Sequence, residues 1–254
     1  MSGAPVVEAR GISKSFAIPA VRRDTLREHA LALFRRRQFR TLRVLDGVSF
    51  ALGRGETLGI MGRNGSGKST LLKIVTGIYR ADAGSITLAA PVTPVLELGV
   101  GFNHELNAID NILLIGTVMG FMLKEMRGAA REILESAGLA PFAGLELKHF
   151  SSGMSARLAW AIAFRTVKEV LILDEVVAVG DAEFRARCRR DLEELHEAGH
   201  SLLLVSHNPD DIARFCRRAL LLEAGRVVLE GSGSEVASAY LELLQRPSPP
   251  ASPS

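Results

Sequence analysis

The sequence predicts an α/β fold built around a phosphate-binding loop, with an antiparallel β subdomain and a helical subdomain beside the core. The segment Gly62-Arg63-Asn64-Gly65-Ser66-Gly67-Lys68-Ser69 fits the pattern of Gly, four residues and Gly-Lys-Ser/Thr that is typical of such loops. Apolar strand-like runs alternate with helical stretches around this loop, as in α/β proteins. Strand-like stretches early and late in the chain, at 48–52, 85–88 and 220–229, indicate the antiparallel sheet.

The residues around the loop favour phosphate binding. The run 57–61 is typical of a short buried strand, and 70–75 of the helix that follows the loop. Glycines let backbone N–H groups approach phosphate oxygens, and the helix N-terminus adds partial positive charge. In such a loop Lys68 can reach the β- and γ-phosphates, and the Ser69 hydroxyl can bind Mg²⁺. The alternative is a glycine turn before a helix that binds nothing, which this context disfavours.

Length and composition limit the class of protein. With 254 residues and 47% hydrophobic content the chain can bury a large core, and its net charge of +3 excludes a nucleic-acid polycation. The longest apolar candidate, 112–123, is too short to span a bilayer, and the N-terminus lacks the pattern of a secretory signal. The two cysteines, Cys188 and Cys216, have no metal-type spacing, which predicts reduced thiols in a cytosolic compartment. We expect one domain over 1–244 and a disordered Pro/Ser-rich tail over 245–254.

Two features precede the loop. A strand is predicted to open at 5–9. Phe16 beyond it could stack on an adenine ring, but the residues alone favour an ordinary core phenylalanine. The segment 22–43 carries eight arginines against two acidic residues, so its net charge is +6 and the rest of the chain carries −3. Apolar residues at helical spacing predict a short amphipathic helix there, formed by Leu26, Ala30, Leu33 and Phe34. This basic insertion could lie on anionic lipid, dock on a partner protein, or be a solvated surface helix.

The second half of the chain carries further candidate residues. From about 103 to 157 the pattern is mostly helical, with helices expected at 112–123 and 125–137 and a stop at Gly138. A buried strand at 170–174 ends in Asp174 and Glu175, which suit Mg²⁺ binding and a general base that takes a proton from water. The strand 201–205 precedes His207, which could contact the γ-phosphate, and Asp181 lies on the loop beyond the acidic pair. Ser151, Ser152 and Gly153 stand at a helix start, where small polar residues can form an anion site.

These motifs, in this order over about residues 5–243, resemble the nucleotide-binding subunit of an ABC transporter. The resemblance implies a RecA-like P-loop NTPase core, ATP and Mg²⁺ as cofactors, and ATP hydrolysis. It places residues 62–70, from Gly62 to Thr70, on the nucleotide, with Lys68 on the phosphates and Ser69 and Asp174 on Mg²⁺. It also places Phe16 on adenine, Glu175 as the base, His207 on the γ-phosphate and Asp181 in the family's Asp loop. Residues 151–153 fall on the signature that contacts the ATP of the opposite subunit, so a homodimer is implied.

The chain departs from the family pattern at two places. The usual signature is Leu-Ser-Gly-Gly-Gln. In this chain Ser152 replaces the first glycine of that signature, and Met154 replaces the glutamine. The family also has a Gln before the helical region, and this chain has none there, so Glu97 could substitute as a contact to metal or water.

The departures point to a subgroup. The segments 97–106, 150–154 and 179–184, with the Arg-rich insertion, resemble subunits that export O-antigen, capsule or teichoic acid. This implies a peripheral ATPase at the cytoplasmic face of the membrane, a separate integral membrane permease, and polysaccharide cargo. We expect the chain to lack the additional carbohydrate-binding domain of some members, and expect no nucleic-acid partner. The alternatives are an exporter of lipid or drug, and a soluble ABC ATPase that acts on ribosomes or DNA.

Overall fold

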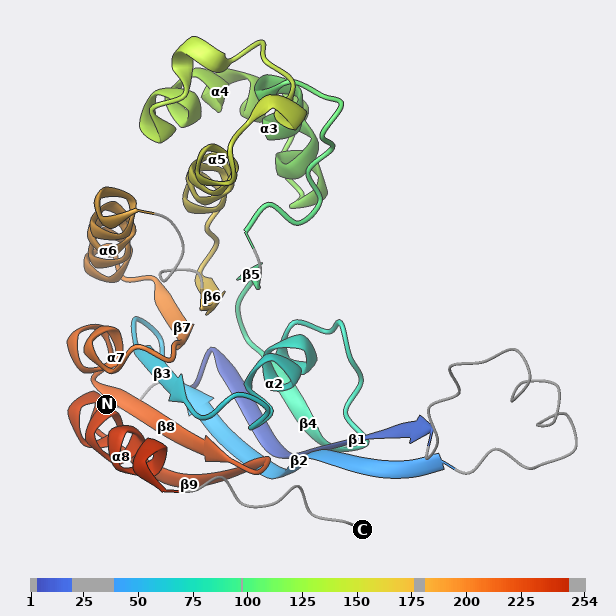
Figure 1. Cartoon of the computed structure of the whole chain (residues 1–254), viewed down its shortest axis with the longest axis vertical. Coiled ribbons are helices and arrows are strands. Elements are labelled where there is room, and N and C mark those ends of the chain that lie inside the picture. Colours follow the sequence, from blue (N-terminus) through green and yellow to red (C-terminus); the bar gives the residue numbers. More distant parts are fainter. Residues whose placement is uncertain (1–3, 20–38, 97, 176–180, 247–254) are drawn as a thin grey trace, which may run out of the picture.

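The computed structural model describes residues 4–19, 39–96, 98–175 and 181–246. It contains two β-sheets and a separate group of helices, which Figure 1 shows above the sheets. The predictions for residues 20–38, 97 and 176–180 lie outside the described residues, and these include the amphipathic helix of the basic insertion and Glu97. The α/β class with an antiparallel sheet and a helical subdomain is confirmed.

The main sheet has six strands in the order β5-β6-β7-β3-β8-β9. The first five run parallel, and β9 pairs antiparallel with β8. Strands β3 and β7 are buried along their whole length, as expected for central parallel strands covered on both faces. The strands are β3 (Thr57–Met61), β5 (Val92–Val95), β6 (Val170–Asp174), β7 (Ser201–Val205), β8 (Arg218–Glu223) and β9 (Arg226–Gly231).

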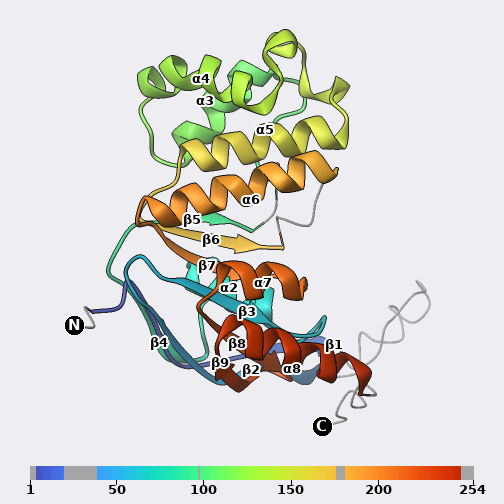
Figure 2. The same cartoon turned by 90° about the vertical axis from the view of Figure 1, so that its left-hand side faces the viewer.

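Alternate residues of these strands enter two different cores. Ile60 and Leu203 pack with α2 (Lys68–Val75) and the second sheet, whereas Met61 and Leu202 pack on the opposite face. That opposite face is covered by three helices, which Figure 2 shows stacked along it: α6 (Ala182–Glu197), α7 (Pro209–Phe215) and α8 (Gly233–Gln245).

The second sheet is antiparallel, in the order β2-β1-β4. Its strands are β1 (Val7–Pro19), β2 (Phe39–Leu52) and β4 (Ala83–Leu88). The early part of the predicted antiparallel patch is therefore confirmed, but the late hairpin is not part of it. Strand β8 pairs with β3 in the main sheet, because its four central residues are all buried and need cover on both faces.

The helical subdomain has its own core between α3 (Ala108–Val118), α4 (Leu123–Ala137) and α5 (Ser152–Arg165). A single helix over 112–123 is wrong, because α3 ends at Val118 and Gly120 takes a φ of +90°. The Phe121 amide then donates to the Gly116 carbonyl, and α4 begins at Leu123. Gly138 ends α4 as predicted, with a φ of +70°.

Three further boundaries differ from expectation. The limit of the helical region expected at about 157 falls inside α5, which continues to Arg165. The tail was expected from 245, but Gln245 is the last residue of α8 and Arg246 follows as its cap. Arg40 and Arg43, the last two arginines of the basic insertion, lie in β2. Among the described residues, we find no helix with the length and apolar character needed to cross a bilayer.

Candidate functional site

The residues predicted to bind phosphate and metal follow three neighbouring strands and lie at one edge of the main sheet. Strand β3 runs into the loop at Gly62, β6 ends at Asp174 and Glu175, and β7 leads to His207. Because β6, β7 and β3 are adjacent and parallel, their carboxyl ends meet at the same edge. The fold thus brings together residues that are far apart in sequence.

The phosphate-binding loop is closely packed by the backbone of two strands. A Cβ on Gly62 would lie 2.2 Å from the Leu222 carbonyl oxygen at the end of β8. A Cβ on Gly67, whose φ is +108°, would lie 2.8 Å from the Val44 carbonyl oxygen of β2. Both positions therefore require glycine because neighbouring backbone leaves no room for a side chain. Helix α2 begins directly after the loop at Lys68, and loop N–H groups together with a helix N-terminus are suited to binding an anion.

Lys68 lies buried inside the curve of the loop, with 6% of its side chain exposed. Its ammonium donates to the Gly62 carbonyl at 2.7 Å and to the Arg63 carbonyl at 3.2 Å. The nearest carboxylate is that of Glu175, with Nζ to Oε1 at 3.9 Å. Burial lowers the pKa of Lys68, and the negative charges of Glu175 and Asp174 partly oppose this shift. The site therefore holds a desolvated cation at the sheet edge.

Asp174 and Ser69 form a pair that can hold a metal ion. Burial raises the pKa of the Asp174 carboxyl, while a hydrogen bond from the Ser69 hydroxyl acts in the opposite direction. The Oδ1 atom of Asp174 is buried and has no hydrogen-bond partner among the described residues. A buried carboxylate oxygen without a partner is costly unless a cation or donor binds there. One carboxylate and one hydroxyl beside a phosphate site suit Mg²⁺, which takes few protein ligands.

Glu175 and His207 face each other beside Lys68. His207 Nδ1 lies 3.5 Å from Glu175 Oε2, and the two side chains are 50% and 38% exposed. Glu175 also has a positive φ of 55°, and its amide donates to the Val205 carbonyl at 2.9 Å. A non-glycine residue in this region is strained, and such strain gathers at functional sites. With this backbone conformation, the Glu175 carboxylate lies beside His207 and remains partly exposed to solvent.

The signature residues lie elsewhere in the same chain. Ser151 caps α5 by accepting a hydrogen bond from the Met154 amide, and Ser151 and Ser152 are exposed. Figure 1 shows α5 in the upper part of the molecule, away from α2. Asp181 caps α6 and pairs with Arg157 of α5 at 2.7 Å, so it is joined to the signature helix rather than to the phosphate loop. As described, one chain does not bring residues 151–153 to Lys68.

Phe16 lies on β1 and is half-buried, and it is absent from the hydrophobic cores of the described residues. Its ring contacts the Tyr79 ring, with centroids 5.7 Å apart and an interplanar angle of 67°. The interpretation as an ordinary core phenylalanine therefore has no support in the structure. Tyr79 was not singled out from the sequence, since a tyrosine in a loop carries no pattern of its own.

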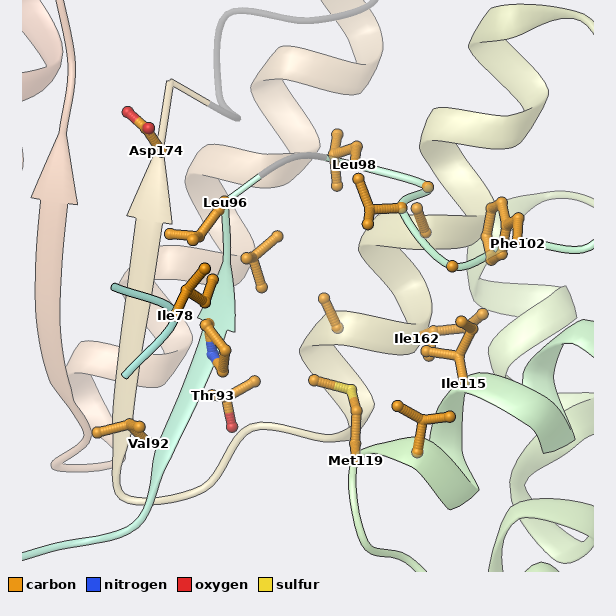
Figure 3. A pocket seen from close by; sticks show the side chains of 18 of the residues that line it. Ile78, Val92, Thr93, Leu96, Leu98, Phe102, Ile115, Met119, Ile162 and Asp174 are labelled. Atoms are coloured by element: carbon orange, nitrogen blue, oxygen red, sulfur yellow. The ribbon is translucent and has the colours of Figure 1, made fainter. Parts of the chain in front are cut away.

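A pocket of about 940 Å³ lies between the sheet edge and the helical subdomain. Ser69, Asp174 and Glu175 line one end of it, and the rest is lined mostly by apolar side chains of β5, α3, α5 and the loop 98–102. Figure 3 shows Leu98, Phe102 and Met119 around it with Asp174 at one end. Sequence reasoning missed β5, although its short apolar run 92–96 is a strand signal.

Comparison with known proteins gives one consistent group of relatives. The model of the family described as ABC transporter matches residues 45–178. The chain is 38% identical to the ABC transporter protein AbcA of Aeromonas salmonicida, over 94% of this chain and 77% of the relative. It is 36% identical to the O-antigen export system ATP-binding protein RfbB of Klebsiella pneumoniae, over 79% of this chain and 81% of the relative.

Solved structures agree on the fold. An ATP-binding cassette solved as a dimer in a post-hydrolysis state with ADP and Pi superposes with a TM-score of 0.72. The match covers 89% of this chain and 98% of that chain at 23% sequence identity.

Proposed function

The chain belongs to the ABC transporter family, and from that premise we propose that it is the ATP-hydrolysing subunit that powers export of a lipid-linked polysaccharide. The main support for this proposal is one structural observation. At one edge of the main sheet, beside the phosphate-binding loop, lie the side chains of Lys68, Asp174, Glu175 and His207. The cargo class is supported by similarity to subunits named for O-antigen and teichoic acid export. The export path belongs to a separate integral membrane permease, with this subunit at its cytoplasmic face.

The residues divide the chemistry between them. Loop N–H groups and Lys68 hold the β- and γ-phosphates, and Phe16 stacks on the adenine. Ser69 and Asp174 would hold Mg²⁺, which neutralises charge on the phosphates when bound. Glu175 takes a proton from the water that attacks the γ-phosphorus, and ADP leaves as the bond to its β-phosphate oxygen breaks. His207 holds Glu175 and the γ-phosphate in position, as its 3.5 Å distance from Glu175 supports.

The active unit is a homodimer. Residues 151–153 are exposed to half-buried and lie apart from the loop of their own chain, so the helix N-terminus they form can receive the γ-phosphate held by a second copy. A cassette of the same fold was solved as a dimer, which supports this arrangement. The ion pair between Arg157 and Asp181 joins the signature helix to α6, so both would move together as the dimer closes.

The amount of glycan at the cell surface and inside the cell tests this function. A strain that lacks the gene should accumulate long glycan inside the cell and show none at the surface, by gel and by lectin or antibody. Wild-type protein should restore export, and Glu175→Gln protein at the same level should not. Normal surface glycan in the deletion strain, with no internal accumulation and no second exporter, would redirect the assignment to another cargo such as lipid or drug.

A further inference from the structure

Tyr79 occupies the junction between the phosphate-binding helix and the strand that carries Phe16. Helix α2 ends at Val75, and Gly77 takes a φ of +77° just beyond it. This turn sends the chain back along the helix, so the Tyr79 amide donates to the Lys73 carbonyl at 2.9 Å. The Lys73 ammonium lies 5.6 Å from the centre of the Tyr79 ring. The aromatic ring is thereby fixed to the last turn of α2.

The same ring meets Phe16 edge to face. The two centroids are 5.7 Å apart at an interplanar angle of 67°, a favourable geometry for an aromatic pair. The Lys14 ammonium lies 5.5 Å from the centre of the Phe16 ring. Phe16 is therefore held by Tyr79 and by a cation, although it is only half-buried.

The segment just after Tyr79 fixes the backbone of β1 around Phe16. Asp82 accepts from the Ser15 amide at 2.6 Å and pairs with Lys14 at 2.7 Å. The Asp82 amide in turn donates to the Ser13 carbonyl at 2.9 Å. The loop 78–82 thus anchors the residues on the N-terminal side of Phe16, while Tyr79 anchors its side chain.

We propose that Tyr79 is a positioning residue for the adenine base, which holds the Phe16 ring in a stacking orientation and ties it to the phosphate-binding helix. A ring that is already oriented loses less side-chain freedom when a base stacks on it. Because Tyr79 is bound to α2 and Phe16 to β1, the distance between the base site and the phosphate site is also fixed. This inference rests on the proposed function, since it takes Phe16 as the residue that stacks on the base.

The test compares a ligand that has a base with one that has none. Isothermal titration calorimetry measures ATP and inorganic tripolyphosphate, each with Mg²⁺, on the full chain. Tyr79→Ala should raise the Kd of ATP about three- to tenfold, which corresponds to about 0.7–1.4 kcal/mol, and leave the Kd of tripolyphosphate unchanged. Tyr79→Phe is the matched control, because it keeps the ring that meets Phe16, and it should bind both ligands like the wild type.

Phe16→Ala serves as the reference variant and should weaken ATP at least as much as Tyr79→Ala. The double variant should be no weaker than Phe16→Ala alone, since Tyr79 acts through Phe16. Unchanged ATP affinity in Tyr79→Ala, or an equal loss for ATP and tripolyphosphate, would overturn the positioning role. If Phe16→Ala itself binds ATP normally, the base site of the proposed function fails together with this inference, while the assignment of the phosphate loop stands.

Discussion

The Gly225 amide donates to the Ser66 carbonyl at 3.1 Å, and the Gly225 carbonyl accepts from the Asp46 amide at 2.9 Å. One glycine in the β8–β9 turn thus joins the phosphate-binding loop to β2. Its φ is +79°, and a Cβ there would lie 2.4 Å from the Val44 carbonyl oxygen. The loop therefore owes its shape to backbone contacts made by residues distant in sequence, as well as to its own glycines.

Gly225→Ala should disturb the loop without touching any side chain of the site. The new Cβ must displace Val44 or the turn, which removes the hydrogen bond to Ser66 and should raise the Kd of ATP about three- to tenfold. Gly138→Ala is the matched control, because its φ is +70° and its Cβ would meet nothing within 4 Å. Both variants should lose stability in thermal unfolding, but only Gly225→Ala should bind ATP more weakly. Equal ATP affinity in the two variants would show that the turn does not hold the loop.

The sheet edge could be predicted because its signals are local. The loop pattern, the buried run into Asp174 and the run into His207 each lie within a few residues, and parallel pairing brings their ends together. The contact between Gly225 and Ser66 could not be predicted, since no local pattern pairs a hairpin turn with a distant loop. For the same reason Phe16 could be singled out from the sequence, whereas its contact with Tyr79 could not be predicted.

The helix boundaries show the limit of periodicity. The run 112–123 contains no charged residue and is apolar except for Thr117 and two glycines, so its polarity pattern does not mark where α3 ends. The break depends on Gly120, which has a positive φ and whose amide donates a hydrogen bond to the Thr117 carbonyl. Both features belong to the turn and leave no trace in the hydrophobic pattern. Ser151–Gly153 could be recognised as a helix start because a serine cap and small residues are local signals.

Glu175→Gln should separate nucleotide hydrolysis from nucleotide binding. It removes the proton acceptor but leaves the loop and Lys68 in place, so kcat should fall about 10²- to 10⁴-fold while ATP affinity is kept. Phosphate release measures the first effect and calorimetry the second. Size-exclusion chromatography with ATP should show a trapped dimer. Lys68→Ala is the contrasting variant and should weaken ATP binding itself. A rate near that of the wild type in Glu175→Gln would assign the base to another residue.

Ser151→Arg should act on the ATP of the partner subunit. Alone, it places a bulky cation at the N-terminus of α5 and should abolish ATP-driven dimerisation and hydrolysis. Mixed with Glu175→Gln chains, it should regain activity, because one of the two sites in each mixed dimer then combines an intact Glu175 with an intact Ser151. Ser151→Ala controls for the lost cap, which costs about 1 kcal/mol. If the mixture stays as inactive as both parents, the signature does not act in trans.

Asp174→Asn should stabilise the protein at neutral pH while removing the proposed metal ligand. Burial raises the pKa of Asp174 in the folded state, so its protonated form contributes stability that is lost as pH rises through that pKa. The neutral amide avoids this loss, so the Tm of the variant should exceed that of the wild type at neutral pH, with a smaller difference in acid. Stabilisation by ATP with Mg²⁺ should be weaker.

Asp46→Asn should change the Tm at neutral pH in the opposite direction. Hydrogen bonding from Arg226 lowers the pKa of Asp46, so its carboxylate contributes stability above the unfolded pKa that is lost in acid. This variant should have a lower Tm than the wild type at neutral pH. A lower Tm for Asp174→Asn as well would mean that Lys68 and Lys73 outweigh burial at Asp174.

Reversal of Arg35, Arg36 and Arg37 to Glu should reduce binding to the membrane face. Residues 22–43 carry a net charge of +6 and lie outside the phosphate motifs in the sequence. Each basic residue near an anionic surface contributes about 1 kcal/mol, so sedimentation with vesicles of phosphatidylglycerol should fall sharply and should also weaken with salt. Vesicles of phosphatidylcholine are the control, and basal ATPase in solution should stay at the wild-type rate because the phosphate motifs are intact. Loss of binding only in membranes that contain the permease would assign the segment to that protein instead, and unchanged sedimentation in every case would leave it a solvated surface.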